Sequence, residues 1–187
     1  MSRITFVLGG ARSGKSRHAE ALAEKHRGAK TYIATAEALD TEMRERIATH
    51  RSRRGGQWNT REAPLDLVAA LEEVETGLVL IDCITVWIGN LMHHGRDARA
   101  EVARLCDALK NTRARVVVVS NEVGLSIVPE NALARAFRDE QGFANQRLAE
   151  IAGDVIFVAA GLPLVLKKAS RRQAPARTAK SGRGRKA

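Results

Sequence analysis

The chain of 187 residues is long enough to bury the core of a single domain, and 44% of its residues are hydrophobic. Its net charge of +10 is concentrated at one end, since 167–187 holds nine of the 31 Lys and Arg residues and no acidic residue. Residues 1–166 then contain 22 basic against 21 acidic residues, which argues against a nucleic-acid-binding face on the body of the protein.

The first predicted elements enclose a glycine-rich loop. Residues 4–8 are apolar and predict a buried strand, whereas 17–25, rich in Ala, Glu and Lys, predict a helix. A strand that feeds such a loop into a helix forms a phosphate cradle, because backbone N–H groups and the positive end of the helix face the anion. The loop matches G-x-x-x-x-G-K-[ST] at every fixed position, in Gly9, Gly10, Ala11, Arg12, Ser13, Gly14, Lys15 and Ser16.

This loop predicts a bound nucleoside triphosphate, either ATP or GTP. Lys15 is expected to reach the β- and γ-phosphates, and the hydroxyl of Ser16 is expected to ligate Mg²⁺. The alternative is a glycine loop with accidental spacing. The strand and helix on either side favour nucleotide binding.

Apolar runs alternate with helix-like segments along the rest of the chain. Further strands are predicted at 31–35, 78–82, 115–120 and 154–159, with a short edge strand at 161–166. Helices are predicted at 40–51, 64–75, 97–110 and 131–152, the last two capped by Asp97 and Asn131. Nearly continuous β-branched strands separated by crossover helices indicate a three-layer α/β fold, in which a mainly parallel sheet carries helices on both faces.

Asp82 closes the predicted strand 78–82. A carboxylate at the end of a neighbouring strand would lie beside the phosphate loop and could hold Mg²⁺, directly or through water. The alternative is a cap for a helix that starts near Ile84.

Within the charged stretch 40–62, five arginines at positions 44–54 flank a single histidine, His50. Their guanidinium groups are suited to binding phosphate oxygens. Neutral imidazole can attack phosphorus and form a phosphoramidate, which splits one group transfer into two steps. The alternative is a basic, solvated helix with an incidental histidine.

Polar residues follow the strand 115–120, at the position where ligands bind in open α/β sheets. Glu122 is a candidate base for an attacking hydroxyl group, or a ligand to Mg²⁺ through water. Equally, Asn121 and Glu122 could simply begin a loop.

The motifs together resemble those of the bifunctional adenosylcobinamide kinase / adenosylcobinamide-phosphate guanylyltransferase family of cobalamin biosynthesis. The resemblance runs from the first strand to about Lys167. It is most specific in 121–131, which reads NEVGLSIVPEN. The other matching segments are 9–20, 32–35, 42–43, 46–47 with His50, 58–62, 82–85, 137–139 and 145–148.

The resemblance implies two reactions. The γ-phosphoryl group of ATP or GTP passes to the aminopropanol hydroxyl of adenosylcobinamide. His50, which matches the guanylylated histidine of the family, then accepts GMP from GTP and transfers it to adenosylcobinamide phosphate. Lys15, with Mg²⁺ at Ser16 and Asp82, would stabilise the charge on the phosphates.

The resemblance also implies further nucleotide contacts, a RecA-like sheet and a homotrimer. The contacts would be made by Ala34, Thr35, Ala36, Arg51, Ser52, Arg53, Arg54 and Glu62. Two other functions remain open at this point. One is a P-loop kinase for another small molecule without nucleotidyl transfer, and the other is a RecA-like nucleic-acid ATPase.

The sequence divides into a kinase/guanylyltransferase domain, 1–167, and a basic tail, 168–187, which lacks large apolar residues and is expected to be disordered. The tail could contact nucleic acid or an anionic surface, or it could be a solvated extension with no partner. No apolar run is long enough to span a bilayer, and the first residues do not follow the pattern of a signal peptide. Because its two cysteines lie in segments predicted to be interior, we expect a cytoplasmic protein.

Overall fold

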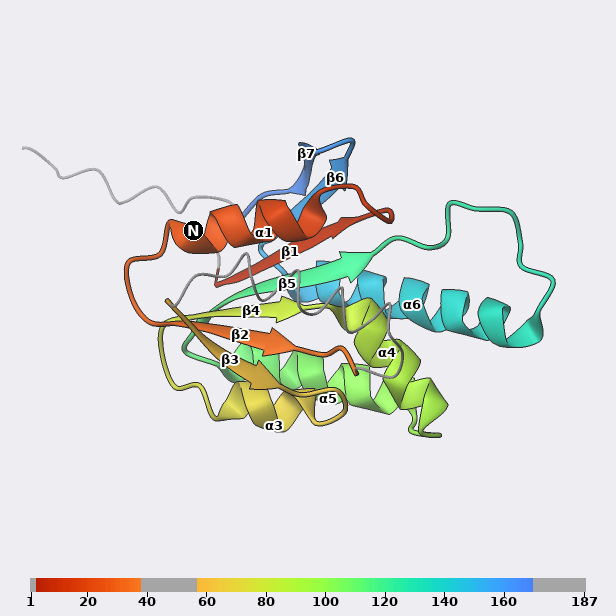
Figure 1. Ribbon diagram of the computed structural model, residues 1–187, viewed down its shortest axis with the longest axis horizontal. Coiled ribbons are helices and arrows are strands. Elements are labelled where there is room, and N and C mark those ends of the chain that lie inside the picture. Colours follow the sequence, from red (N-terminus) through yellow and green to blue (C-terminus); the bar gives the residue numbers. More distant parts are fainter. Residues whose placement is uncertain (1–2, 38–56, 170–187) are drawn as a thin grey trace, which may run out of the picture.

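The computed structural model describes residues 3–37 and 57–169, which form a seven-stranded sheet with helices on both faces (Figure 1). The strands are β1 Ile4–Gly9, β2 Lys30–Ala34, β3 Trp58–Glu62, β4 Leu78–Asp82, β5 Arg115–Asn121, β6 Asp154–Ala159 and β7 Leu162–Lys167. They lie in the order β3-β2-β4-β5-β1-β6-β7, and every neighbouring pair is parallel except β6 and β7. The predicted, mainly parallel sheet is confirmed.

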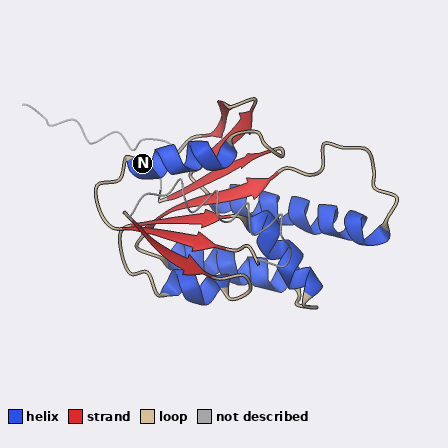
Figure 2. Ribbon diagram, in the orientation of Figure 1, coloured by secondary structure: helices blue, strands red, loops and turns tan. Residues whose placement is uncertain are grey.

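The helices form two outer layers (Figure 2). Helix α1 Lys15–Glu24 covers one face, and α3 Leu67–Glu72, α4 Ile84–His93, α5 Ala98–Asn111 and α6 Ala132–Ile151 cover the other. Strand β5 is buried between them because its side chains alternate. Val117 and Val119 pack with Ala19 of α1, whereas Val116 and Val118 belong to the larger core under α4, α5 and α6.

Two predicted caps fix the starts of the longest helices. The carboxylate of Asp97 accepts a hydrogen bond from the backbone N–H of Ala100 at 3.0 Å. The side chain of Asn131 accepts from the backbone of Leu133 and Ala134, at 2.8 and 3.2 Å. Each cap satisfies backbone donors that the first turn of a helix leaves without partners.

The structure differs from the sequence-based expectation in three elements. Strand β3 was not predicted, because its sequence WNTRE lacks an apolar run, and it forms at the edge by pairing with β2. Helix α4 was not among the predicted elements of the fold, and a helix near Ile84 entered only as one that Asp82 could cap. Helix α3 is shorter than the expected 64–75, because Ala63 still donates to the carbonyl of Ala34 and Asp66 is the N-cap.

The predicted helix 40–51 and most of the basic tail lie outside the described residues. Within 3–37 and 57–169, no helix combines the length and apolar character needed to cross a membrane.

Candidate active site

The glycine-rich loop connects the end of β1 to the start of α1, as the sequence predicted. Gly9 ends the strand, and a Cβ there would lie 2.3 Å from the carbonyl oxygen of Val158, too close for any side chain. Gly14 precedes the helix with φ of 93°, a left-handed conformation that glycine adopts without strain. Both glycines are therefore required by the backbone path, and this path places Lys15 and Ser16 in the first turn of α1.

Lys15 extends back toward the loop. Its side chain is largely buried, and Nζ donates a hydrogen bond to the carbonyl of Gly10 at 3.2 Å. An ammonium group at this position can neutralise the β- and γ-phosphates of a nucleotide held by the loop. The geometry is consistent with the predicted role.

Asp82 lies beside the first turn of α1. Its Oδ1 accepts a hydrogen bond from the Ser16 hydroxyl at 3.4 Å, and its Oδ2 accepts one from the Tyr32 hydroxyl at 2.8 Å. Hydroxyl and carboxylate oxygens are the ligands that Mg²⁺ prefers, so Ser16 and Asp82 together fit that ion. The N-cap of α4 is Cys83, which does not support the alternative that Asp82 caps this helix.

Two neighbours of Asp82 had no role assigned from the sequence. Tyr32 orients the carboxylate through the hydrogen bond just described. Desolvation, together with the negative charge of Asp82, raises the pKa of the Cys83 thiol to about 11. The thiol stays protonated at neutral pH and is therefore a poor nucleophile.

Residues 34–36 lie next to Asp82, because Ala34 pairs with Asp82 between β2 and β4. The Thr35 hydroxyl is fully buried, and it donates to the carbonyl of Cys83 at 2.8 Å and accepts from the Cys83 N–H at 2.9 Å. Asn90 donates to the Thr35 carbonyl at 2.8 Å. The Thr35 side chain thus holds the backbone together at this edge of the sheet. The predicted nucleotide contacts of 34–36 remain predictions.

Two glutamates from the prediction lie at the same edge of the sheet. Glu62 ends β3 and pairs with Ala34. The backbone N–H of Glu122 donates to the carbonyl of Gly9 at 3.1 Å, which keeps Glu122 beside the glycine loop. Its Oε1 accepts from the backbone N–H of Gly124 at 2.7 Å. This position is consistent with a base near the phosphates, and the role stays a prediction.

The predicted nucleophile and the remaining predicted nucleotide contacts lie outside the described residues. The nucleophile is His50, and the contacts are Arg51, Ser52, Arg53 and Arg54.

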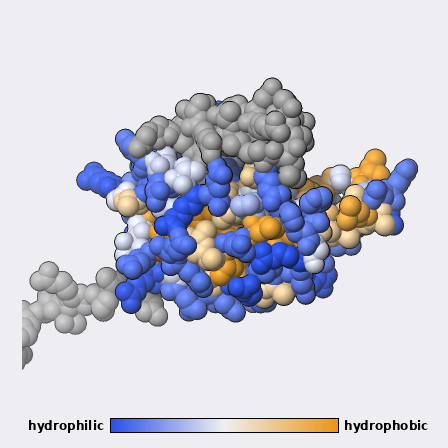
Figure 3. All heavy atoms as spheres, turned by 60° about the horizontal axis from the view of Figure 1, so that its bottom comes forward, coloured by the Kyte–Doolittle hydropathy of each residue, from blue (hydrophilic) through white to orange (hydrophobic). Residues whose placement is uncertain are grey.

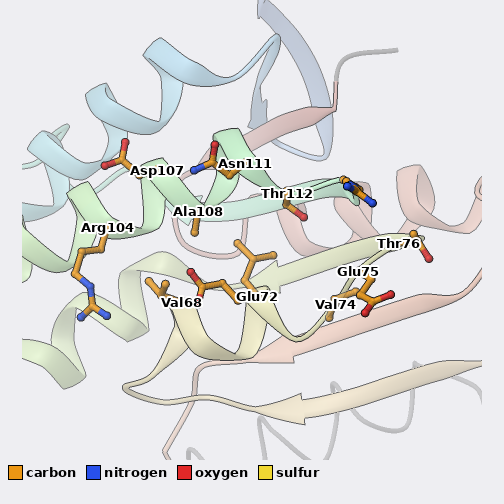
Figure 4. Close-up of a pocket in the computed structure, with 12 residues that line it drawn as sticks. Val68, Glu72, Val74, Glu75, Thr76, Arg104, Asp107, Ala108, Asn111 and Thr112 are labelled. Atoms are coloured by element: carbon orange, nitrogen blue, oxygen red, sulfur yellow. The ribbon is translucent and has the colours of Figure 1, made fainter.

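A hollow of about 620 Å³ between α3 and α5 is separate from this site (Figure 4). Val68 and Ala108 contribute to its apolar lining. The lining also includes Thr76 and Thr112, which lie just before the first residues of β4 and β5. Asp82 lies at the other end of β4, as its last residue. The hollow therefore lies at the opposite edge of the sheet from the glycine loop.

Comparison with known proteins identifies the family. The sequence profile of cobinamide kinase / cobinamide phosphate guanyltransferase matches residues 5–166, from β1 to β7. The chain belongs to this family. The bifunctional adenosylcobalamin biosynthesis protein CobP of Pseudomonas aeruginosa is 47% identical over 166 residues, which cover 87% of this chain and 96% of the relative. The bifunctional adenosylcobalamin biosynthesis protein CobU of Salmonella typhimurium is 41% identical over 181 residues, covering 88% and 99%.

This membership confirms the resemblance that the motifs indicated, and it makes the chain an enzyme of the bifunctional cobinamide kinase family. Among solved structures, a KaiC-like protein from Pyrococcus horikoshii matches with a TM-score of 0.49 and 13% identity, over 91% of this chain and 82% of that one. A similarity at this level says nothing about function.

Proposed function

We propose that this member of the cobinamide kinase family performs two reactions in sequence on one corrinoid. It first transfers the γ-phosphoryl group of ATP or GTP to the aminopropanol hydroxyl of adenosylcobinamide. It then transfers GMP from GTP to the new phosphate, giving adenosylcobinamide-GDP and pyrophosphate. The main support within the chain is the grouping of Lys15, Ser16 and Asp82 at the glycine loop.

In the first reaction, the bond from the γ-phosphorus to the bridging oxygen breaks and a bond to the corrinoid hydroxyl oxygen forms. Lys15 balances negative charge that moves onto the β-phosphate. Ser16 and Asp82 would hold Mg²⁺, which when bound would supply further positive charge to the phosphates. Glu122, kept beside the loop by its backbone contact with Gly9, accepts the hydroxyl proton.

The second reaction passes through a covalent intermediate on His50. The neutral imidazole attacks the α-phosphorus of GTP, pyrophosphate leaves, and a phosphoramidate forms. An oxygen of the corrinoid phosphate then attacks the same phosphorus and releases the imidazole. The support is that His50 matches the guanylylated histidine of the family to which the chain belongs. The neighbouring Arg51, Arg53 and Arg54 offer cations for phosphate oxygens.

Labelling with GTP tests the covalent step. After incubation with Mg²⁺ and GTP radiolabelled at the α-phosphorus, the protein should carry label that is stable to base and lost in acid. The variant His50→Ala should take up no label, because alanine has no ring nitrogen that could attack the α-phosphorus and hold GMP. Phosphorylation of adenosylcobinamide by this variant should remain within about twofold of wild type.

A matched control is His26→Ala, which removes a histidine just beyond α1 and should leave labelling unchanged. Wild-type protein that phosphorylates adenosylcobinamide but takes up no label would be a kinase without nucleotidyl transfer. That result would exclude the second reaction.

The basic segment 168–187 is proposed to be accessory to both reactions. Its charge would bind DNA or RNA through phosphate contacts that weaken as salt increases. Removing 168–187 should abolish salt-dependent DNA binding and leave GTP turnover unchanged. DNA-stimulated hydrolysis by the truncated chain would instead favour a nucleic-acid ATPase.

We further propose that the enzyme is a homotrimer. Figure 3 shows a hydrophobic projecting end, and the β5–α6 connection and the start of α6 expose Leu125, Ile127, Val128 and Leu133. Strand β7 exposes Leu162, Leu164, Val165 and Leu166. Exposed apolar patches of this kind mark contacts with other chains. Light scattering should give three copies for wild type and fewer for Ile127→Asp. A monomeric wild type would contradict the proposal.

A further inference from the structure

The end of strand β5 lies between the two halves of the phosphate site. In the sheet, β5 separates β1, which leads into the glycine loop, from β4, which ends in Asp82. Its last residue, Asn121, pairs with Gly9, the first residue of the loop. The polar side chain at this position is thus next to both elements that would surround a bound triphosphate.

The alternation of β5 places the Asn121 side chain on the same face of the sheet as α1. Val117 and Val119 pack in the cluster that contains Ala19 of α1. Asn121 is two residues farther along and shares their face, since strand side chains alternate with a period of two. By the same rule, Asp82 shares the face of Leu80, which belongs to that cluster too. Asn121 and Asp82 therefore lie on the reactive side of the sheet.

A buried hydrogen-bond network holds the backbone of Asn121 from both sides. The Thr85 hydroxyl accepts from the Asn121 N–H at 2.7 Å, and the Asn145 side chain donates to the Asn121 carbonyl at 3.0 Å. The Ser120 hydroxyl donates to Asn145 Oδ1 at 2.7 Å. The side-chain NH₂ group of Gln141 donates to the Ser120 hydroxyl at 2.8 Å and to Asn145 Oδ1 at 2.9 Å.

This network is a positioning device. Thr85, Ser120, Gln141 and Asn145 are all buried, and their contacts fix the Asn121 main chain without using its side chain. A side chain held this firmly and left out of the network is available to a ligand.

The side-chain amide of Asn121 has a buried atom that lacks a partner. Within the part of the chain that the structure describes, no group forms a hydrogen bond with Oδ1, although this atom is shielded from solvent. Buried polar atoms are nearly always paired, so an unpaired one next to a phosphate loop indicates a partner brought by the ligand. A 180° rotation of the amide exchanges its oxygen with its NH₂ group at this position.

We propose that Asn121 is a catalytic residue of the kinase reaction and that its amide NH₂ group donates a hydrogen bond to a γ-phosphoryl oxygen. The inference rests on the proposed kinase function and adds a third group to Lys15 and the Ser16–Asp82 pair. A neutral amide suits this position. It contacts the phosphoryl oxygens while the group moves from the β–γ bridging oxygen to the hydroxyl oxygen, and it takes no proton itself.

A binding comparison separates contact with the γ-phosphoryl group from nucleotide binding in general. The variant Asn121→Ala should lose about tenfold in affinity for a non-hydrolysable ATP analogue, the effect of one hydrogen bond to a charged group. Its affinity for ADP, which has no γ-phosphate, should stay within twofold of wild type. The variant Asn121→Asp should lose more affinity for the analogue, because a carboxylate repels phosphate.

The matched control is Asn111→Ala, at the exposed end of α5 and far from the loop, which should change neither affinity. Equal losses for ADP and the analogue in both Asn121 variants, or no loss for either ligand, would overturn the proposal. The titrations need no corrinoid, so they also test Asn121 if adenosylcobinamide proves not to be the substrate. In that case the proposed kinase substrate would be rejected, whereas the proposed contact between Asn121 and the γ-phosphate would still be tested by the two affinities.

Discussion

The two faces of the sheet at the end of β5 are both polar, yet they differ in how their polar groups are paired. On the face of α4 and α6, Ser120, Gln141 and Asn145 are buried and bonded mainly to one another. On the face of α1, Lys15 and Asp82 lie beside a glycine loop shaped for an anion.

The difference shows that polarity alone does not mark a reactive site. A buried polar network whose members pair with one another rigidifies the fold. Charged groups arranged around a backbone cradle can exchange their contacts for those of a ligand. Substitutions on the α1 face should therefore reduce activity, and substitutions on the α6 face should reduce stability.

The largest effect is expected for Lys15→Ala. Loss of this ammonium removes a positive charge that stabilises the phosphates in the transition state, so kcat should fall by about 10²–10³-fold. The midpoint of thermal unfolding should change little. Steady-state kinetics with ATP and adenosylcobinamide measure the first quantity. The control Lys25→Ala, at the exposed end of α1, should keep full activity, and a similar loss in that variant would contradict a specific role for Lys15.

The next effect concerns the metal position. Asp82→Asn keeps an oxygen for the Tyr32 hydroxyl but removes the charge that would hold Mg²⁺, so kcat should fall by roughly a hundredfold. The Mg²⁺ concentration needed for half-maximal rate should rise. Tyr32→Phe leaves the charge in place and should cost less than tenfold. If both variants show the same Mg²⁺ dependence as wild type, Asp82 does not hold the metal.

On the opposite face, Asn145→Ala should destabilise the protein by about 2 kcal/mol, because it removes the acceptor of the Ser120 hydroxyl proton and the donor to the Asn121 carbonyl. Urea unfolding measures this change. The exposed control Asn111→Ala should stay within about 0.5 kcal/mol of wild type. A stable Asn145→Ala protein would show that the network does not hold the end of β5.

The smallest effect is a dependence on pH. Because the folded state raises the pKa of Cys83 from 9.0 to about 11, the unfolded chain loses its thiol proton first as the pH increases. The stability from this group is complete below pH 9 and is lost between pH 9 and about pH 11. Alkylation by iodoacetamide at pH 9 should therefore be slow for native Cys83 and fast in urea. Equal rates in the two states would contradict a raised pKa.

The sequence predicted the parts of the fold that have a strong local signal. The strand preceding the glycine loop and the β-branched strand β5 are continuous apolar runs, and both were found close to their expected bounds. Strand β3 was missed because a polar edge strand owes its conformation to its pairing with β2.

In the candidate site, the sequence predicted the positions of residues that belong to one continuous motif, such as Lys15 and Ser16 at the end of the glycine loop. The hydrogen bond from Tyr32 to Asp82 depends on two strands lying side by side, which no local pattern reveals. Gln141 and Asn145 resemble residues on the solvated face of a helix. Their burial becomes evident only once α6 is placed against β5.

The most direct test of the proposed function is the mass of the products that the purified chain makes from adenosylcobinamide. With ATP and Mg²⁺, the corrinoid should gain one phosphoryl group, and after addition of GTP it should gain one GMP with release of pyrophosphate. A corrinoid that stays unmodified while the protein hydrolyses ATP or GTP would contradict the proposed function.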